Sequence, residues 1–197
     1  MLEPTALRRA GRTLFVGDVH GCARELDTLL RSVEPERVVL AGDLFTKGPD
    51  PKGVWSIIQD WDAEAVLGNH DALVLEEWRA GRDLPRSTFR WLKRCPWLLE
   101  GESWVTVHAG VHPRDWRKTR KRHALHLREW KDSGQYWWDR YGGPHLVIHG
   151  HNQRFGLIDR RPYTLGLDTG CVRGGALTGY LLEEDRLVSV PARRDYT

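Results

Sequence analysis

Six side chains that can bind divalent metal ions lie in or near short glycine-containing segments of this sequence. Each follows a short apolar run typical of a buried strand, so each is expected where a strand ends. The donors are carboxylate and amide oxygens and imidazole nitrogens without a thiolate, a set that suits Mn, Fe or Zn. The predicted metal ligands are Asp18, His20, Asp43, Asn69, His108 and His149.

Six ligands are too many for one tetrahedral ion, so the pattern predicts two neighbouring ions that share a carboxylate. Asp43 lies in the loop that is central in chain order and is the natural bridging ligand. Two ions about 3.5–4 Å apart lower the pKa of a shared water and neutralise a phosphoryl group under attack. The chemistry expected of these residues is therefore metal-assisted hydrolysis of a phosphoester.

Four further residues are candidates for the other parts of such a reaction. His70 directly follows the predicted ligand Asn69 and need not bind metal itself, so we predict that it protonates the leaving oxygen. The alternative is a histidine with a local hydrogen bond at the start of a helix. Lys47 and Arg140 are candidate cations for the phosphate oxygens. His151 is interpreted as a loop residue, with a ligand or an outer partner of the site as alternatives.

Strands that end at a common edge must position these residues. Apolar runs predict a strand before each candidate, and helical spacing predicts helices between the first strands. Alternating strands and helices are typical of a parallel sheet covered by helices, in which ligands bind at the carboxyl edge. The predicted strands are residues 12–16, 37–41, 65–67, 104–107 and 146–148, and the predicted helices are 23–33, 54–61 and 72–80, the last capped at Gly81.

The rest of the chain has a weaker pattern. We interpret about 72–100 and 112–143 as helical or irregular insertions, the second of them as an aromatic-rich lid over the ligand edge. No shift in composition divides the chain, so residues 1–197 are expected to form a single domain. Short strands, expected to form a second sheet, are predicted for residues 164–168, 176–183 and 186–190.

Composition limits the class of protein. With 29% charged and 40% hydrophobic residues among 197, the chain is neither disordered nor fibrous. Three cysteines without a Cys-x-x-Cys pair argue against a disulfide framework and a structural zinc site. No apolar run approaches the roughly 20 residues that span a bilayer, and no signal peptide is visible, so we expect a cytoplasmic protein without a membrane partner. The basic run 114–122 is either a solvated helix face or a landing site for an anionic substrate or nucleic acid.

Five motifs make the sequence resemble the calcineurin-like metallophosphoesterase superfamily, and within it the phosphoprotein phosphatase branch. They occur in family order and span most of the chain. The resemblance implies an α/β fold, a sandwich of two mixed β-sheets flanked by helices, with a dinuclear metal site at the carboxyl edge of the strands. The motifs are Gly17-Asp18-Val19-His20-Gly21, Gly42-Asp43-Leu44-Phe45-Thr46-Lys47-Gly48, Gly68-Asn69-His70-Asp71, Val107-His108-Ala109-Gly110 and His149-Gly150-His151.

Inside this branch, the sequence looks like the symmetrical diadenosine tetraphosphate hydrolases of bacteria. That resemblance implies a Mn- or Co-dependent enzyme that splits a dinucleoside polyphosphate, most of all diadenosine tetraphosphate, into two nucleoside diphosphates. The chain is shorter than we expect for these enzymes, which leaves cleavage to ATP and AMP open. The similar stretches are residues 17–30, 68–71, 108–116 and 167–178.

Three features of the sequence leave substrates other than dinucleoside polyphosphates open. Thr46-Lys47 stands where protein phosphatases of this branch typically carry Asp-Arg, so the carboxylate partner of the catalytic histidine is missing and a point charge replaces a bidentate guanidinium. This disfavours the alternative function, a bacterial protein serine/threonine phosphatase. Trp116 and Trp138 are candidates for stacking on adenine, with structural packing as the alternative. The basic run and its aromatic neighbours leave RNA 5′ ends as a remote partner, through cap removal or RNA binding.

Overall fold

The first of two β-sheets carries the amino-terminal strands. In the computed structural model, which describes residues 11–77, 84–130 and 134–197, β1 pairs in parallel with β2 and β2 with β3, while β9 and β10 add antiparallel pairs. The sheet is therefore mixed. Its spatial order is β10 (Arg186–Pro191), β9 (Ala176–Leu181), β1 (Thr13–Val16), β2 (Arg37–Leu40) and β3 (Glu64–Ala65).

The second sheet is mixed as well. Its three inner strands β5, β6 and β8 are parallel, and the edge strands β4 and β7 are antiparallel to their neighbours. The α/β architecture of two mixed sheets is thus confirmed. The order in this sheet is β4 (Leu98–Glu100), β5 (Trp104–Val107), β6 (Leu146–His149), β8 (Thr164–Gly166) and β7 (Ile158–Arg160).

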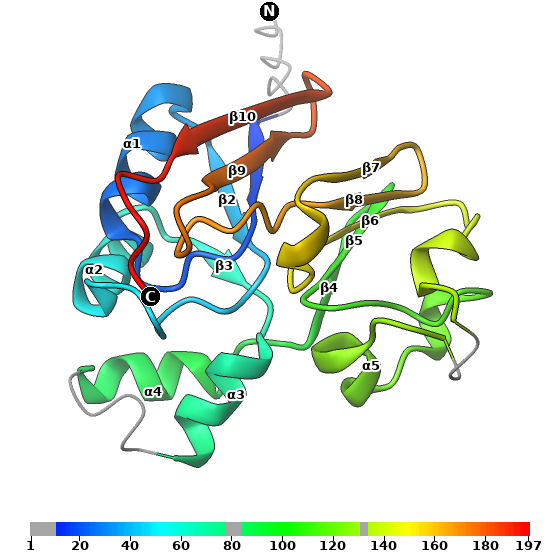
Figure 1. Ribbon diagram of the computed structural model, residues 1–197, viewed down its shortest axis with the longest axis horizontal. Helices are drawn as coiled ribbons and strands as arrows, with labels where there is room; N and C mark the ends of the chain where they lie inside the picture. Colours follow the sequence, from blue (N-terminus) through cyan, green and yellow to red (C-terminus); the bar gives the residue numbers. More distant parts are fainter. Residues whose placement is uncertain (1–10, 78–83, 131–133) are drawn as a thin grey trace, which may run out of the picture.

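The period of two in β1 divides its side chains between two layers. Leu14 and Val16 pack against the helices on the outer side of the first sheet, in one cluster with Leu26 and Leu30 of α1. Helix α1 (Ala23–Val33) has the amphipathic stripe predicted for it. Helix α2 (Pro51–Asp60) starts at a proline, and the Asp50 side chain accepts a hydrogen bond from the Gly53 N–H at 2.8 Å. Figure 1 shows both helices beside this sheet.

Residues that point the other way form the layer between the sheets. Phe15 of β1 and Tyr180 of β9 belong to one buried cluster with Trp104, Ile148 and Leu165 from the second sheet. Phe15 and Trp104 meet edge to face, with ring centroids 4.8 Å apart. The two sheets therefore pack face to face, and this contact fixes the ends of β1 and β6 relative to one another.

Aromatic residues cover the outer face of the second sheet. Trp116, Trp137, Trp138 and Tyr141 pack in one cluster with valines of β5 and β6. The aromatic side chains of this cluster thus cover a sheet face and do not lie over the ligand edge, because indole rings lose more water-exposed apolar area there. The short helices of this segment are η2 (Trp116–Lys118), α5 (Lys121–His126) and η3 (Trp137–Asp139).

The last third of the chain is divided between the two sheets, so the prediction that its short strands form a second sheet is wrong for β9 and β10. Strand β8 joins β6, while β9 pairs with β1 and places buried Leu177 and Leu181 in the core under α1. In the first sheet β9 lies between β1 and β10, and this central position buries both of its faces. Pairing only with strands of the last third of the chain would not bury both faces. The other short elements are η4 (Gln153–Phe155), α3 (Asn69–Glu76) and α4 (Arg86–Leu92).

The predicted helix 72–80 overlaps α3 in the residues that the structure describes. Its residues 78–80 and the predicted cap Gly81 lie outside the described residues. Within the described ranges, no helix has the length and hydropathy needed to cross a bilayer.

Candidate metal centre

The predicted ligands of the first sheet meet in one polar cavity. It has a volume of about 290 Å³ and lies where the chain leaves β1, β2 and β6. Asp18, His20 and Asp43 are all buried there, with one possible ligand atom of each lying within 4.8 Å of the others. His20 Nε2 is 3.9 Å from the Asp18 carboxylate and 3.6 Å from that of Asp43. These are spacings that one cation could bridge.

Asn69 and His108 extend the cluster on the other side of Asp43. His108 Nε2 lies 3.5 Å from the second carboxylate oxygen of Asp43 and 2.9 Å from the Asn69 amide oxygen. His108 Nδ1 is 2.8 Å from the Ala41 carbonyl oxygen, so Nδ1 carries the proton and the Nε2 lone pair is directed into the cluster. The two oxygens of Asp43 thus face different histidines.

The structure does not bring the predicted ligand His149 into this cavity. Its imidazole is fully buried between Trp137 and Trp138, with ring centroids 5.0 and 5.8 Å away. His149 Nδ1 donates to the Gly150 carbonyl oxygen at 3.1 Å, and Nε2 has no hydrogen-bond partner among the described residues. The prediction of His149 as a site residue is therefore wrong: it packs in the core of the second sheet.

His151 takes the place expected for His149. It lines the cavity, its Nδ1 lies 3.2 Å from His108 Nε2, and its backbone N–H donates to the Asp18 carboxylate at 3.0 Å. The argument that residues 149 and 151 share a face holds only in a strand, and β6 ends at His149. His151 has a φ of 68°, in the left-handed region, so the chain turns and the two imidazoles part.

Backbone strain concentrates at this cluster. His20, Asp43 and His151 have φ values of 45°, 55° and 68°, which side-chain-bearing residues adopt rarely and at a cost of about 1–3 kcal/mol each. The glycines beside them allow close approach, since a Cβ atom at Gly150 would collide with the Asp18 carboxylate and one at Gly68 with Asp43. Positions held in such conformations are often functional.

Burial and mutual repulsion shift the pKa values of the carboxylates and imidazoles in the cluster. Burial raises the pKa of Asp18 well above its usual value, and repulsion from Asp168 and Asp43 raises it further. Burial likewise raises the pKa of Asp43 to about 6 and lowers the pKa of His108 to about 4. Neutral imidazoles and crowded carboxylates present mainly lone pairs to each other, so the donor set fits a divalent cation, which would reverse the repulsion.

His70 and Lys47 both line the cavity. The His70 backbone N–H donates to Asp43 at 2.9 Å, and its ring lies edge-on to His20 with centroids 5.2 Å apart. Within the described ranges, no carboxylate accepts a hydrogen bond from the His70 imidazole. The Lys47 ammonium stands 3.1 Å from His20 Nε2, and Thr46 Oγ1 lies 3.2 Å from His20 Nδ1. A cation is thus already placed against the lone pair of a predicted ligand.

Asp71 fixes the loop that presents Asp43. Its carboxylate accepts hydrogen bonds from the backbone N–H groups of Asp43, Leu44 and Gly68 at 2.7, 2.9 and 3.0 Å. The side chain is fully buried. One carboxylate therefore ties the loop after β2 to the start of α3, and so holds Asp43 and Asn69 in register.

Comparison with known proteins decides the family. The sequence profile of the calcineurin-like phosphoesterases matches residues 11–177. The chain belongs to the calcineurin-like phosphoesterase family. Membership implies divalent metal ions, in agreement with the donor set of the cavity, and a phosphoester-hydrolysing activity.

Similar proteins within this family have two kinds of described activity. The chain is 24% identical to the asymmetrical bis(5′-nucleosyl)-tetraphosphatase PrpE of Oceanobacillus iheyensis, over 92% of this chain and 93% of the relative. It is 32% identical to the symmetrical bis(5′-nucleosyl)-tetraphosphatase of Vibrio parahaemolyticus, but spans only 45% of that enzyme's length, with 51% of its own. The serine/threonine-protein phosphatase 1 of Salmonella typhimurium is 27% identical, with coverages of 83% and 88%.

A solved structure supports the same placement within the calcineurin-like phosphoesterases. The protein in that structure has the provisional description of a diadenosine tetraphosphatase. Its sequence is 31% identical to this chain, and the two structures superpose with a TM-score of 0.85. The match covers 94% of this chain and 95% of the other. The fold of two sheets is therefore shared over essentially the whole length.

Four charged residues of this phosphoesterase line the cavity although the sequence did not single them out as site residues. Asp168 follows β8 in an Asp-Thr-Gly segment, the same arrangement of strand, acid and glycine that revealed Asp43, and could have been found in that way. Burial raises its pKa. Arg128, Arg154 and Arg173 also line the cavity and carry no local signal, because distant segments bring them there.

Three predicted contact residues lie elsewhere in the phosphoesterase. Arg140 is exposed, donates to the Gln135 side chain at 3.2 Å and does not line the cavity. Trp116 and Trp138 are 5% and 4% exposed, so neither offers an open face to a base. Trp116 Nε1 lies 3.3 Å from His145, and Trp138 is stacked on Tyr136. The structure thus places both tryptophans in the core, in agreement with structural packing, the alternative to base stacking.

Proposed function

We propose that this phosphoesterase hydrolyses dinucleoside polyphosphates, diadenosine tetraphosphate above all, by attack of water on a phosphoanhydride phosphorus. The observation that supports this most is the charge of the cavity. The cluster of Asp18, His20 and Asp43 shares it with Lys47, Arg128, Arg154 and Arg173. Four cationic side chains around one metal-type cluster suit a substrate with several adjacent phosphates better than a single phosphoester.

The distances within the cluster support our proposal of which residues would hold two divalent ions. The two oxygens of Asp43 face His20 at 3.6 Å and His108 at 3.5 Å, so Asp43 would be shared between the sites. When bound, such a pair supplies an activated water and neutralises phosphoryl charge. Manganese is our first choice, with Co, Fe or Zn as alternatives. The proposed ligands are Asp18, His20, Asp43, Asn69, His108 and, in place of His149, His151.

His70 is proposed to protonate the leaving phosphate oxygen. It lines the cavity from the first turn of α3, and its backbone is fixed to Asp43. Burial lowers its pKa, while the Asp43 carboxylate opposes this shift. Lys47 donates to His20 Nε2 in this structure. Because that lone pair cannot serve both partners, binding of an ion at His20 would free the Lys47 ammonium for the substrate phosphates.

The experiment is incubation of the purified protein with diadenosine tetraphosphate and Mn, followed by chromatography of the products. Two molecules of ADP would indicate symmetrical cleavage, and ATP with AMP asymmetrical cleavage. Both modes occur among the relatives, and PrpE, with the asymmetrical one, matches this chain over most of its length. Intact dinucleotide after prolonged incubation would reject the proposal.

A second candidate function is dephosphorylation of phosphoserine or phosphothreonine in proteins. The Salmonella typhimurium phosphatase, which matches 83% of this chain, favours it. Release of phosphate from phosphopeptides with no product from the dinucleotide would support this alternative. RNA 5′ ends gain no support, since none of the relatives described above is named for activity on RNA.

A further inference from the structure

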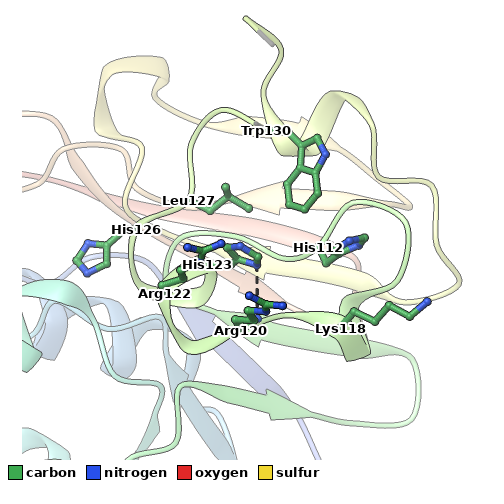
Figure 2. A pocket seen from close by; sticks show the side chains of 8 residues that line it. All are labelled: His112, Lys118, Arg120, Arg122, His123, His126, Leu127 and Trp130. Carbon is green, nitrogen blue, oxygen red and sulfur yellow. Dashed lines mark hydrogen bonds between the residues drawn. The ribbon is translucent and has the colours of Figure 1, made fainter. Parts of the chain in front are cut away.

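A second cavity is lined by helix α5 and by residues before and after it. Its volume of about 820 Å³ is in the range of small-molecule sites. Figure 2 shows that its wall comes from a single stretch of chain, the loop before η2, helix α5 and the residues after it. The lining residues are His112, Lys118, Arg120, Arg122, His123, His126, Leu127 and Trp130.

The charge of this cavity is of one sign. Lys118, Arg120 and Arg122 contribute cations, and none of the described residues that line it is acidic. Lys118 lies 3.7 Å from the Asp115 carboxylate in an exposed pair, which holds it weakly. In the part of the chain that is described, neither Arg120 nor Arg122 forms an ion pair with a carboxylate. Guanidinium groups without an internal counter-ion are suited to bind phosphate.

The rings of the cavity add flat apolar surface beside these cations. Trp130 meets His112 and His123 edge-on, with ring centroids 4.7 and 5.7 Å apart, and Figure 2 shows its indole directed toward the interior of the group. Leu127 adds an aliphatic wall. An aromatic ring next to several cations is the combination that binds a nucleoside phosphate, since the base stacks while the phosphates pair.

The two cavities are adjacent along the chain. His126 and Leu127 line this one, and the next residue, Arg128, lines the metal-type cavity. The segment 126–128 therefore contributes to the walls of both cavities. An extended anionic ligand could therefore pass over His126–Arg128 and be bound at both.

We propose that the cavity lined by Arg120, Arg122 and Trp130 binds the second nucleotide of a dinucleoside polyphosphate while the first reaches the metal centre. This proposal rests on the proposed function. It gives the basic run 114–122 a role, because three of its cations line the cavity. It also predicts that affinity for the dinucleotide, and not the hydrolytic step, depends on these side chains.

A matched pair of double variants tests this. Arg120→Gln with Arg122→Gln removes two lining cations, and Arg114→Gln with Lys121→Gln removes two exposed cations of the same run that do not line the cavity. We expect the first variant to raise KM for diadenosine tetraphosphate by at least about tenfold. The turnover of p-nitrophenyl phosphate, which is too small to span both sites, should be unchanged. Equal KM values for the two double variants would overturn the proposal.

Binding of ADP separates failure of this proposal from failure of the proposed function. Equilibrium dialysis in EDTA needs no turnover, and we expect ADP to bind the control variant and to bind the Arg120→Gln, Arg122→Gln variant at least about tenfold more weakly. Trp130→Leu, with its fold checked by circular dichroism, should weaken ADP binding as well. Equal ADP affinity in both double variants overturns the proposal even if the dinucleotide is hydrolysed. Tighter binding of single-stranded RNA than of ADP, lost in the same variant, would also overturn it.

Discussion

The assignment of His151, and not His149, to the metal centre can be tested by one substitution made at two positions. His151→Asn removes an imidazole that lines the cavity 3.2 Å from His108. His149→Asn removes an imidazole packed between two tryptophans of the core. The side chain removed and the one introduced are the same, so the two variants differ in position alone.

The structure sets different magnitudes for the two variants. Loss of even an outer partner of a metal site typically lowers metal affinity 10–100-fold, so loss of His151 should lower it by about 100-fold, or about 2.7 kcal/mol. His149 is fully buried and contributes packing on Trp137 and Trp138. Its loss should lower the free energy of unfolding by about 1–3 kcal/mol, with the metal affinity unchanged.

Isothermal titration with Mn and thermal unfolding of the metal-free proteins measure both quantities. We expect His151→Asn to lose affinity and keep its Tm, and His149→Asn to lose Tm and keep its affinity. The opposite result, in which His149→Asn loses the metal while folded and His151→Asn retains it, would refute the geometric reasoning.

Four other perturbations have defined outcomes. His70→Gln should lower kcat for the dinucleotide by about 10²–10⁴-fold with Mn content unchanged by elemental analysis. Asp71→Asn should lower the free energy of unfolding by about 3 kcal/mol in urea titrations, because three backbone N–H groups lose a charged acceptor. Burial lowers the pKa of His149 from 6.5 to about 4, so the folded state binds fewer protons than the unfolded state between pH 6.5 and pH 4. The free energy of unfolding should therefore fall by about 3 kcal/mol as the pH drops through this range. Calorimetry of His149→Asn should show a weaker dependence of stability on pH. Gly150→Ala should weaken Mn binding in titrations, since its Cβ would collide with the Asp18 carboxylate.

The sequence predicted those site residues that follow directly on a buried strand. Asp18 and Asp43 come after short continuous apolar runs and before turns, so local pattern alone fixes where their side chains emerge. The same logic gave α1, whose observed bounds, Ala23–Val33, are the predicted ones. In these cases the determining interactions lie within a few residues of the site.

The predictions failed where the chain leaves the regular period or where the partner is distant. His149 and His151 differ by a backbone turn at φ 68° that no residue type announces. Arg128 reaches the cavity from the segment after α5, and Arg154 from η4. Trp116, Trp137 and Trp138 show no helical period because they are placed by the face of the second sheet and not by their own helices. Long-range packing of this kind leaves no trace in a local pattern.

The cluster is an unfavourable arrangement that its surroundings must maintain. Two buried carboxylates with raised pKa values, Asp18 and Asp43, lie together beside left-handed backbone at His20 and His151. Hydrogen bonds that the Asp71 carboxylate accepts from three backbone N–H groups hold one loop of the site, and the contact between the two sheets holds the strands. Because these supports lie outside the cavity, they persist when the charge inside it changes. A preformed, electrostatically unsatisfied set of donors is therefore available to a divalent cation without rearrangement of the strands, and the free energy of binding that cation would be gained mainly by relieving the repulsion between the carboxylates.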